Sequence, residues 1–412
     1  MVEATGKYLN RNVILISLSA FFADMGYQAV TAVFAILLVV VMHEPAYIYG
    51  LLLALSFGLG SLISLIGGKL GDRFGKKPVA LLGNLLIPLM SLSVLFSNLY
   101  ILGAFFILGW WARYFRSPVR RAWLVEVSDP AFRSQVFGFL HALDIGGGIV
   151  AVAYSIVFII MGISLTEIIL LTAIPLLISS FCLLSAGTEL HMNYVADRRR
   201  SEQEVGPQSE NSTLKENRFL FRAVLISATL FGFSYYALGF PIITVSDATG
   251  SYIYGILTFG IYLGVSAISG IFLGTFRGKK PMRTLWSLGY LLAAGSSLII
   301  GTSFAVNGLL LMYYIGAAGL GFATGSVETF EPVIIAAVSR ARKVSTGMGW
   351  LSSSRALGLF FSNSIMGLIF AISVFYSYLY AAVTSFLAAL ILIVAELIII
   401  RRQSGDRQVL TG

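Results

Sequence analysis

Long apolar runs separated by short polar breaks extend over almost the whole chain. A helix needs about 20 mostly apolar residues to cross the hydrocarbon core of a bilayer, and twelve runs reach about that length. The first is too long for the apolar region of a cleavable signal peptide. The pattern predicts transmembrane helices, here numbered spans 1 to 12, over 13–41, 47–68, 78–97, 99–127, 134–161, 165–188, 219–243, 250–273, 281–303, 308–338, 344–371 and 374–400.

The composition indicates an all-α membrane protein. Of 412 residues, 57% are hydrophobic and 11% are charged, whereas soluble domains carry about 25% charged residues. These values exclude a soluble enzyme, a nucleic-acid-binding protein and a disordered chain. The single cysteine, Cys182, provides no disulfide framework, and the sequence contains no metal-binding or phosphate-loop motif. We therefore expect a chain that is not an enzyme, that has no cofactor and that uses a proton or ion gradient as its driving force.

Basic residues are concentrated in alternate connections between the spans. Of 28 lysines and arginines, three lie deep inside spans (Arg113, Arg116 and Arg355), and the other 25 (28 − 3) lie near the termini or in connections on one side. This asymmetry follows the positive-inside rule. It predicts a plasma or inner membrane protein with both termini in the cytoplasm. The net charge of +9 then reflects topology and attraction to anionic lipid rather than a nucleic-acid partner.

One long polar stretch divides the chain into two halves. Residues 189–218 are rich in Ser, Glu, Asn and Arg, a composition that is typical of a flexible linker. The expected organisation is an N-terminal six-helix bundle over 1–188, a cytoplasmic linker over 189–218 and a C-terminal six-helix bundle over 219–412.

The two halves repeat short motifs. Tyr-Ile-Tyr-Gly opens span 2 at 47–50 and span 8 at 252–255, and Gly-Lys-Lys-Pro follows at 75–78 and again at 278–281. The shifts between the copies, 205 and 203 residues, are nearly equal. Parallel six-helix repeats of this kind build one architecture of secondary transporters.

The connection between spans 2 and 3 carries a family motif. Its sequence, Gly-Lys-Leu-Gly-Asp-Arg-Phe-Gly-Lys-Lys-Pro over 68–78, resembles the signature loop of the major facilitator superfamily. The resemblance covers nearly the whole chain and implies twelve helices in two pseudo-symmetric bundles, alternating access, and a cavity lined by spans 1, 4, 7 and 10. One feature departs from the antiporters of that family: the glycines that follow Asp144 in span 5 are not accompanied by proline, which weakens any inference of proton-driven export.

The same connection contains candidates for an inner gate. Asp72 could cap the amino end of a helix, and the resemblance suggests span 11, near Ser345, as the partner. Arg73 could pair with Glu126 or Asp129 at the end of span 4. The alternative is that the basic residues here, Lys76 and Lys77 above all, only enforce topology. We also expect Arg120 and Glu331 to contribute to this gate.

Ionisable residues inside spans are costly in a bilayer and are therefore functional candidates. The acids are Asp24, Asp144, Glu328 and Glu331, and the bases are Arg113, Arg116, Arg120 and Arg355. A shift of 211 residues places Arg120 opposite Glu331 and Asp144 opposite Arg355 in the repeat. Either the charges form fixed structural pairs, or some pairs break and re-form during transport. A buried pair need not stabilise the fold, which favours the second hypothesis.

The deepest acid is the leading candidate for carrying a proton. Asp24 lies eleven residues into span 1, about 16 Å along the helix, and no base lies near it in the sequence. Asp144 and the Glu328/Glu331 pair come second. His141 precedes Asp144 by three residues, so the two could share a helix face and pass a proton, although an ordinary helix histidine is the simpler interpretation.

Aromatic residues are expected to line the path of the solute. The candidates carried forward are Tyr27 in span 1 and Tyr236 in span 7, with Trp110 and Trp111 in span 4. Such residues are also common on lipid-facing surfaces. Span 7 is expected to bend at Gly239 and Pro241.

Together these observations predict a monomeric secondary transporter that moves a small-molecule substrate by alternating access, surrounded by membrane lipids and coupled to protons, as an efflux or uptake permease. The alternative is a facilitator or exchanger of an anionic solute that binds Arg113, Arg116 and Arg355. A receptor or scaffold that does not transport is a third possibility. The sequence does not indicate the substrate or the direction of transport.

Overall fold

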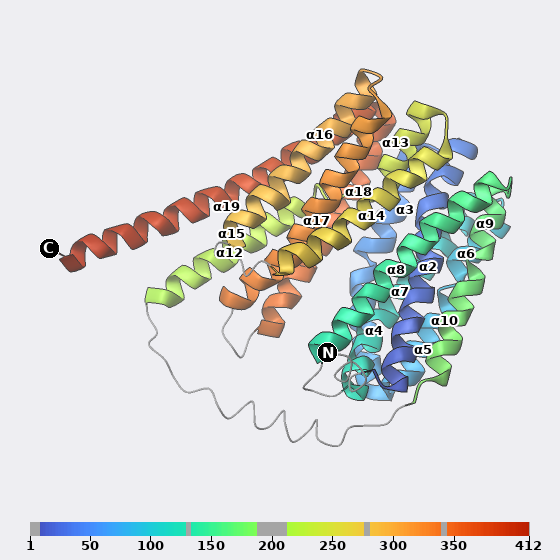
Figure 1. Cartoon of the computed structure of the whole chain (residues 1–412), viewed down its shortest axis with the longest axis horizontal. Coiled ribbons are helices and arrows are strands. Elements are labelled where there is room, and N and C mark those ends of the chain that lie inside the picture. Colours follow the sequence, from blue (N-terminus) through green and yellow to red (C-terminus); the bar gives the residue numbers. More distant parts are fainter. Residues whose placement is uncertain (1–8, 129–132, 188–211, 276–280, 339–343, 412) are drawn as a thin grey trace. The chain divides into compact units, whose positions relative to one another are not determined.

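A computed structural model describes residues 9–128, 133–187, 212–275, 281–338 and 344–411 (Figure 1). Every regular element within these ranges is a helix. Ten helical segments are long and apolar enough to cross a membrane. The other two predicted spans correspond to α7 (Leu99–Val127), whose arginines make it less apolar, and to an interrupted pair of helices described below. The predicted all-α membrane protein is confirmed.

Helix contacts divide the described residues into two compact units. Unit 1 comprises those within Met1–Leu37 and Leu55–Gln208, and unit 2 those within Leu38–Ala54 and Ser209–Gly412. The helices of unit 1 are α2 (Arg11–Ile36), α4 (Gly60–Phe74), α5 (Lys76–Leu86), α6 (Leu89–Leu92), α7, α8 (Arg133–Ile160), α9 (Leu165–Leu171) and α10 (Ala173–Ser185).

Unit 2 contains one short helix from the first half of the chain and all the helices that follow the linker. They are α3 (Ala46–Leu53), α12 (Ser212–Gly232), α13 (Gly239–Thr249), α14 (Tyr252–Thr275), α15 (Pro281–Thr284), α16 (Leu292–Ala305), α17 (Leu310–Val338), α18 (Val344–Ile372) and α19 (Val374–Thr411). Three π-helical turns, Leu37–Val41, Ala54–Gly58 and Leu285–Leu291, continue α2, α3 and α15. Residues 189–211 of the expected linker lie outside the described residues, and 212–218 are helical. The division into two six-helix bundles stays a prediction.

Helix lengths and packing show the internal repeat. Both α7 and α17 have 29 residues, and a shift of 211 superposes their ends (310 − 99 = 338 − 127 = 211). The same shift relates the starts of α8 and α18 (344 − 133 = 211). Packing repeats as well, since α4 contacts α7 as α14 contacts α17, and α2 contacts α8 as α12 contacts α18. Each unit therefore surrounds its copy of the fourth predicted span, α7 in unit 1 and α17 in unit 2, with similar neighbours.

Two of the helices that carry the intramembrane charges of unit 1, α2 and α7, begin at asparagine caps. The side chain of Asn10 accepts a hydrogen bond from the backbone N–H of Val13 at the start of α2. Asn98 accepts from Tyr100 and Ile101 at the start of α7. Such caps satisfy amide groups that a helix terminus leaves without partners.

Two glycines let helices approach closely at equivalent places. A Cβ atom on Gly147 of α8 would overlap the carbonyl oxygen of Phe21 on α2, and one on Gly358 of α18 would overlap Gly232 of α12. The shift is again 211 (358 − 147 = 211). Small residues permit such crossings in membrane helices, so the glycines after Asp144 provide close packing without the proline.

Span 7 is interrupted. The prediction of one continuous helix over 219–243 is wrong, because α12 ends at Gly232 and α13 begins at Gly239, although the expected bend near Gly239 and Pro241 is present. The backbone N–H of Ala237, within the break, donates to Asn363 Oδ1 of α18 at 2.9 Å. Non-helical backbone at membrane depth needs such partners.

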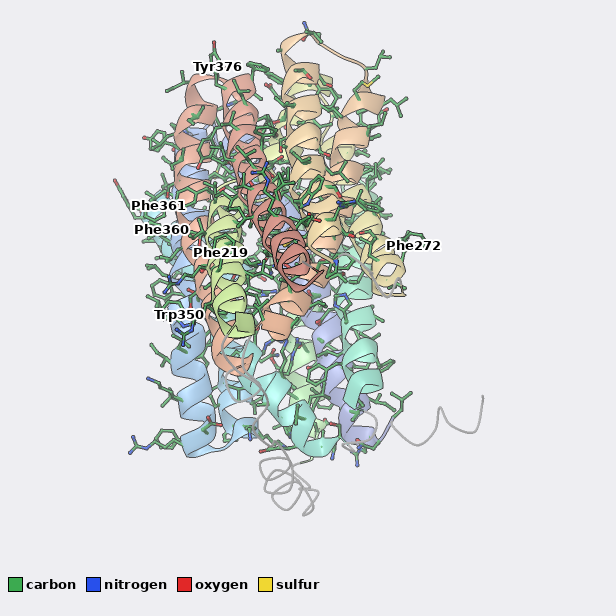
Figure 2. All side chains as sticks on the ribbon, turned by 90° about the vertical axis from the view of Figure 1, so that its left-hand side faces the viewer. Phe219, Phe272, Trp350, Phe360, Phe361 and Tyr376 are labelled. Atoms are coloured by element: carbon green, nitrogen blue, oxygen red, sulfur yellow. The ribbon has the colours of Figure 1, made fainter. Side chains whose placement is uncertain are left out.

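Apolar side chains cover the outside of the helices. In unit 2, Trp350 and Phe361 of α18, Phe272 of α14 and Tyr376 of α19 are exposed aromatic residues at different heights (Figure 2). A surface of this composition is suited to contact with lipid acyl chains and head groups.

Candidate functional site

Unit 1 brings together five of the predicted intramembrane charges. Figure 1 shows α2, α7 and α8, the three helices that carry them, in one part of the molecule, and α2 packs on both of the others. Electrostatic interactions connect Asp24 with Asp144, Arg113 and Arg120. Asp24, Arg116 and Arg120 are 5%, 1% and 4% exposed. This charge cluster consists of Asp24, Arg113, Arg116, Arg120 and Asp144, with three positive groups against two negative ones.

Arg120 and Asp144 form the ion pair of the cluster. Arg120 Nη2 donates to Asp144 Oδ1 at 3.5 Å, a long distance for a charge-assisted hydrogen bond. Nε and Nη1 of Arg120 are buried and have no hydrogen-bond partner among the described residues. The pair therefore uses only part of the donor capacity of the guanidinium group.

Arg116 is bound to neutral groups. Its Nη1 donates to Asn84 Oδ1 of α5 at 2.7 Å, and Asn84 Nδ2 donates to the hydroxyls of Ser179 and Ser180 on α10 at 3.1 and 2.8 Å. Ser179 in turn donates to the carbonyl oxygen of Ser19 on α2 at 2.6 Å. This network fixes the side chain of Arg116, but it supplies no carboxylate to offset the charge.

Aromatic rings surround Arg113. Its guanidinium carbon lies 4.5 Å from the ring centre of Tyr27, 5.3 Å from that of Trp110 and 5.5 Å from that of Tyr114. Cation–π attraction offsets part of the cost of burying the charge. Arg113 Nε and Trp110 Nε1 are nevertheless buried without hydrogen-bond partners within the described part of the chain.

Asp24 is a buried acid with an unused oxygen. Its Oδ2 atom has no hydrogen-bond partner among the described residues, and within them it forms no salt bridge of 4.0 Å or less. This oxygen lacks the hydrogen bonds that water would give it, whereas the carboxyl group as a whole has a hydrogen bond from the side chain of Tyr27. It is a group at which gain or loss of a proton would change the charge of the whole cluster.

Unit 2 contains a more completely bonded network. Glu331 is fully buried and accepts from Tyr290 Oη at 2.6 Å and from Arg355 Nε at 2.7 Å. Arg355 Nη1 donates to Glu328 Oε1 at 2.8 Å, and Nη2 donates to the carbonyl oxygen of Val327 at 3.4 Å. Each nitrogen of Arg355 therefore has a partner, which leaves it poorly placed to bind an anionic solute.

The two networks occupy equivalent positions with exchanged charges. Arg120 and Asp144 are 24 residues apart, as are Glu331 and Arg355, and the shift of 211 relates the first pair to the second. The expected gate between Arg120 and Glu331, which lie in different units, stays a prediction. Within its own unit, Arg120 of α7 pairs with Asp144 of α8, and Glu331 of α17 pairs with Arg355 of α18.

The gate residues expected near the cytoplasmic side pair differently from the prediction. Glu126 forms its ion pair with Lys76, not with Arg73, so Lys76 does more than enforce topology. Arg73 is exposed and its guanidinium carbon lies 5.2 Å from the ring centre of Phe74. Asp72 is exposed at the end of α4, and its role as a cap stays a prediction. Asp129 lies outside the described residues.

The histidine relay gains no support from the contacts. His141 is exposed, whereas Asp144 is half-buried and accepts from Arg120. A spacing of three residues on a helix brings two side chains near each other but does not require them to point into the same environment. Tyr236 is buried and its hydroxyl lies 3.1 Å from that of Ser297, and its place on the path of the solute stays a prediction.

Two polar partners were missed by the sequence analysis. Asn84 and Tyr290 are uncharged and lie in apolar helices, yet they hold Arg116 and Glu331. A lone asparagine in an apolar span is the signal that could have identified the first. No comparable signal distinguishes Tyr290 from the other 18 of the 19 tyrosines.

Comparison with known proteins agrees with this architecture. The sequence pattern described as Major Facilitator Superfamily matches residues 16–327. The chain belongs to the major facilitator superfamily. Membership and fold together make it a multi-pass integral membrane protein of the secondary-transporter class. No curated protein matches it in sequence.

Solved structures of transporters share the fold at low identity. A POT family transporter in complex with a thioalcohol-conjugated peptide is 12% identical, with a TM-score of 0.73 over 93% of this chain and 96% of that one. A D-xylose-proton symporter is 13% identical, with a TM-score of 0.71 over 92% and 96%. The inward-open xylose transporter XylE from E. coli is 14% identical, with a TM-score of 0.68 over 92% and 94%.

Proposed function

We propose that this member of the superfamily moves a small solute across the plasma or inner membrane by alternating access, with transport coupled to a proton carried by Asp24. The observation that supports this most directly is the buried carboxylate with an unbonded oxygen. Intramembrane acids of this kind are costly and typically belong to proton or substrate pathways. In the same proposal the protein is a monomer whose termini both lie in the cytoplasm.

The charge cluster supplies a physical reason for coupling. With both aspartates ionised, its formal charge is +1, because three arginines face two carboxylates. A proton on Asp24 raises this charge to +2 in a region of low dielectric, where electrostatic interactions act strongly. Any solute group that interacts with the cluster therefore binds with an affinity that depends on that proton, and this mutual dependence is a coupling free energy.

One structural neighbour is described as a proton symporter for D-xylose, which is consistent with proton coupling on this fold. At 13% identity, the similarity to this symporter supports a shared fold and does not indicate a shared substrate. The alternative of an anion facilitator that uses Arg355 is less well supported, since Arg355 is held by two glutamates.

The test is proton movement driven by solute. Proteoliposomes that contain a trapped pH-sensitive dye are exposed to gradients of sugars, peptides, organic acids and amines. We expect at least one class to change the internal pH with the wild-type chain, and we expect Asp24→Asn to abolish that change. Asp247→Asn, which alters an exposed acid at the end of α13, is the matched control and should keep it. Equal proton movement by both variants would overturn the assignment.

A further inference from the structure

The charge cluster of unit 1 has more buried donors than acceptors. Nε of Arg113, Arg116 and Arg120 and Nη1 of Arg120 are all buried without a hydrogen-bond partner among the described residues, as is Trp110 Nε1. Buried donors without acceptors cost free energy, and an unbalanced buried charge costs more. Arg355 of unit 2, whose three nitrogens all have partners, shows that this chain can satisfy such a group with its own residues.

We propose that unit 1 binds the carboxylate group of a monoanionic organic solute, with Arg113 as the principal contact. This inference rests on the proposed function and specifies the chemical class of its solute.

The surroundings of Arg113 favour a carboxylate. Its guanidinium group is planar and presents N–H donors along its edge in a fork that matches two carboxylate oxygens. The rings of Tyr27, Trp110 and Tyr114 lie near this group, and the side chains of Tyr27 and Tyr114 also hydrogen-bond to it. Arg113 Nε is buried without a hydrogen-bond partner among the described residues. The indole N–H of Trp110 is a further donor in the same neighbourhood. A ligand oxygen would satisfy donors that the protein leaves unused.

The charge balance favours a single negative charge on the solute. The three arginines exceed the two aspartates by one charge, so one carboxylate neutralises the cluster when both aspartates are ionised. A cation would increase the imbalance. The rings around Arg113 provide apolar surface next to the donors, which suits the hydrocarbon part of an organic acid better than the fully polar surface of inorganic phosphate.

Arg116 and Arg120 contribute as supporting cations. The network through Asn84 fixes Arg116, and Asp144 holds Arg120 through one nitrogen only. Their charges strengthen the positive potential around Arg113. Because hydrogen bonds hold both side chains, they are less mobile than free arginines. The solute therefore binds a preorganised group, which lowers the entropic cost of binding.

The test is equilibrium binding to the purified full chain. Benzoate is the probe, with benzyl alcohol, benzylamine and inorganic phosphate as neutral, cationic and inorganic comparisons. We expect benzoate alone to raise the thermal unfolding midpoint in a concentration-dependent manner. Arg113→Gln should weaken the apparent affinity for benzoate at least tenfold. Arg222→Gln, which removes an exposed arginine of α12 in unit 2, should change it less than twofold.

A second variant protects the test against misfolding. If Arg113→Gln does not yield folded protein, Arg113→Lys serves instead, because it keeps the charge but loses the planar fork. We expect at least a threefold loss of affinity for Arg113→Lys and less than a twofold loss for Arg222→Lys. Equal effects at positions 113 and 222 would overturn the proposal, as would the absence of benzoate binding or phosphate binding as tight as that of benzoate. Binding needs no proton movement, so these outcomes are separate from failure of the transport assay.

Discussion

Arg120 of α7 donates to Asp144 of α8, and the repeat places the same bridge in unit 2 with its charges exchanged. There Arg355 of α18 holds Glu331 of α17, with 2.6 Å between Arg355 Nη2 and Glu331 Oε2. The two halves have thus kept the positions of their charged side chains while the signs of the charges differ. Unit 1 is left with excess positive charge, and its arginines keep unused donors.

The two bridges should differ in their contribution to stability. Arg355→Gln leaves the fully buried Glu331 without its cation and also releases Glu328, and removal of one partner from a buried pair costs about 3–5 kcal/mol. Arg120→Gln breaks a longer bridge to a half-buried acid and relieves excess positive charge, so we expect a smaller loss, about 0–2 kcal/mol on the scale of partly exposed pairs. Thermal unfolding in detergent measures both. An equal or larger loss of stability for Arg120→Gln would contradict the conclusion that Arg355 is the arginine whose donors are all hydrogen-bonded.

The Tyr290 hydroxyl should stabilise unit 2 through Glu331. Tyr290→Phe removes the donor at 2.6 Å from a buried carboxylate, a loss of about 1–3 kcal/mol. Tyr314→Phe is the control, because the Tyr314 hydroxyl is buried without a partner in the described residues and its removal should be neutral or slightly stabilising. Comparable losses of unfolding temperature in the two variants would show that the hydrogen bond to Glu331 contributes little.

The helix crossing at Gly147 should not tolerate a methyl group. A Cβ there overlaps the backbone of Phe21, so Gly147→Ala must separate α2 from α8, and overpacking of this kind costs about 1–3 kcal/mol. Gly264→Ala introduces the same group where no atom lies within 4 Å and should be neutral or stabilising. The ratio of folded to aggregated protein in size-exclusion chromatography, with the unfolding temperature, provides the comparison. Tolerance of alanine at both positions would indicate a looser α2–α8 contact than described.

Binding of benzoate should strengthen as the pH falls. A proton on Asp24 removes one negative charge near Arg113 and Arg120, so the cluster attracts an anion more strongly. The groups that act on Asp24 are Asp144 on α8, the arginines on α7 and Tyr27 on its own helix. The other ionisable groups on helices packed against α2 include Glu167, which caps α9, Cys182 on α10 and Tyr154 on α8, whose hydroxyl donates to the Met25 carbonyl oxygen.

Thermal shift titrations of benzoate at several pH values check this dependence. The wild type should gain affinity toward acidic pH, to the point where benzoate itself becomes protonated, whereas Asp24→Asn should bind with little pH dependence over the same range. Asp247→Asn should behave as the wild type. A pH dependence that persists unchanged in Asp24→Asn would assign the linked proton to another group.

The sequence predicted the helices well because a chain that crosses a lipid bilayer must satisfy its backbone hydrogen bonds internally, which restricts it to few kinds of structure. Apolar length and charge asymmetry located the spans, and 99–127 coincides with the observed α7. The interruption before Gly239 could not be placed to the residue, since it depends on the Asn363 side chain of α18, which supplies an acceptor from far along the chain. The local pattern of apolar and polar residues around Gly239 does not indicate that contact.

The charged residues were identified individually, but their partners were not. The repeat shift correctly aligned Arg120 with Glu331 and Asp144 with Arg355, yet alignment does not determine contact. The partners depend on which side chains reach one another between helices: Arg120 of α7 bonds to Asp144 of α8, and Arg355 of α18 bonds to Glu331 of α17. For the same reason Lys76, at the start of α5, reaches Glu126, whereas Arg73 lies near the end of α4, before the break at Gly75.

The most direct test of the central claim separates proton carriage from solute movement in Asp24→Asn. The solute that drives proton movement in the wild type is followed as a radiolabel in proteoliposomes, first under an imposed pH gradient and then in exchange against unlabelled solute at equal pH. The account predicts that Asp24→Asn loses accumulation driven by the pH gradient and retains exchange, because the solute site can still alternate without a proton on residue 24. Accumulation at the wild-type level in Asp24→Asn would contradict it.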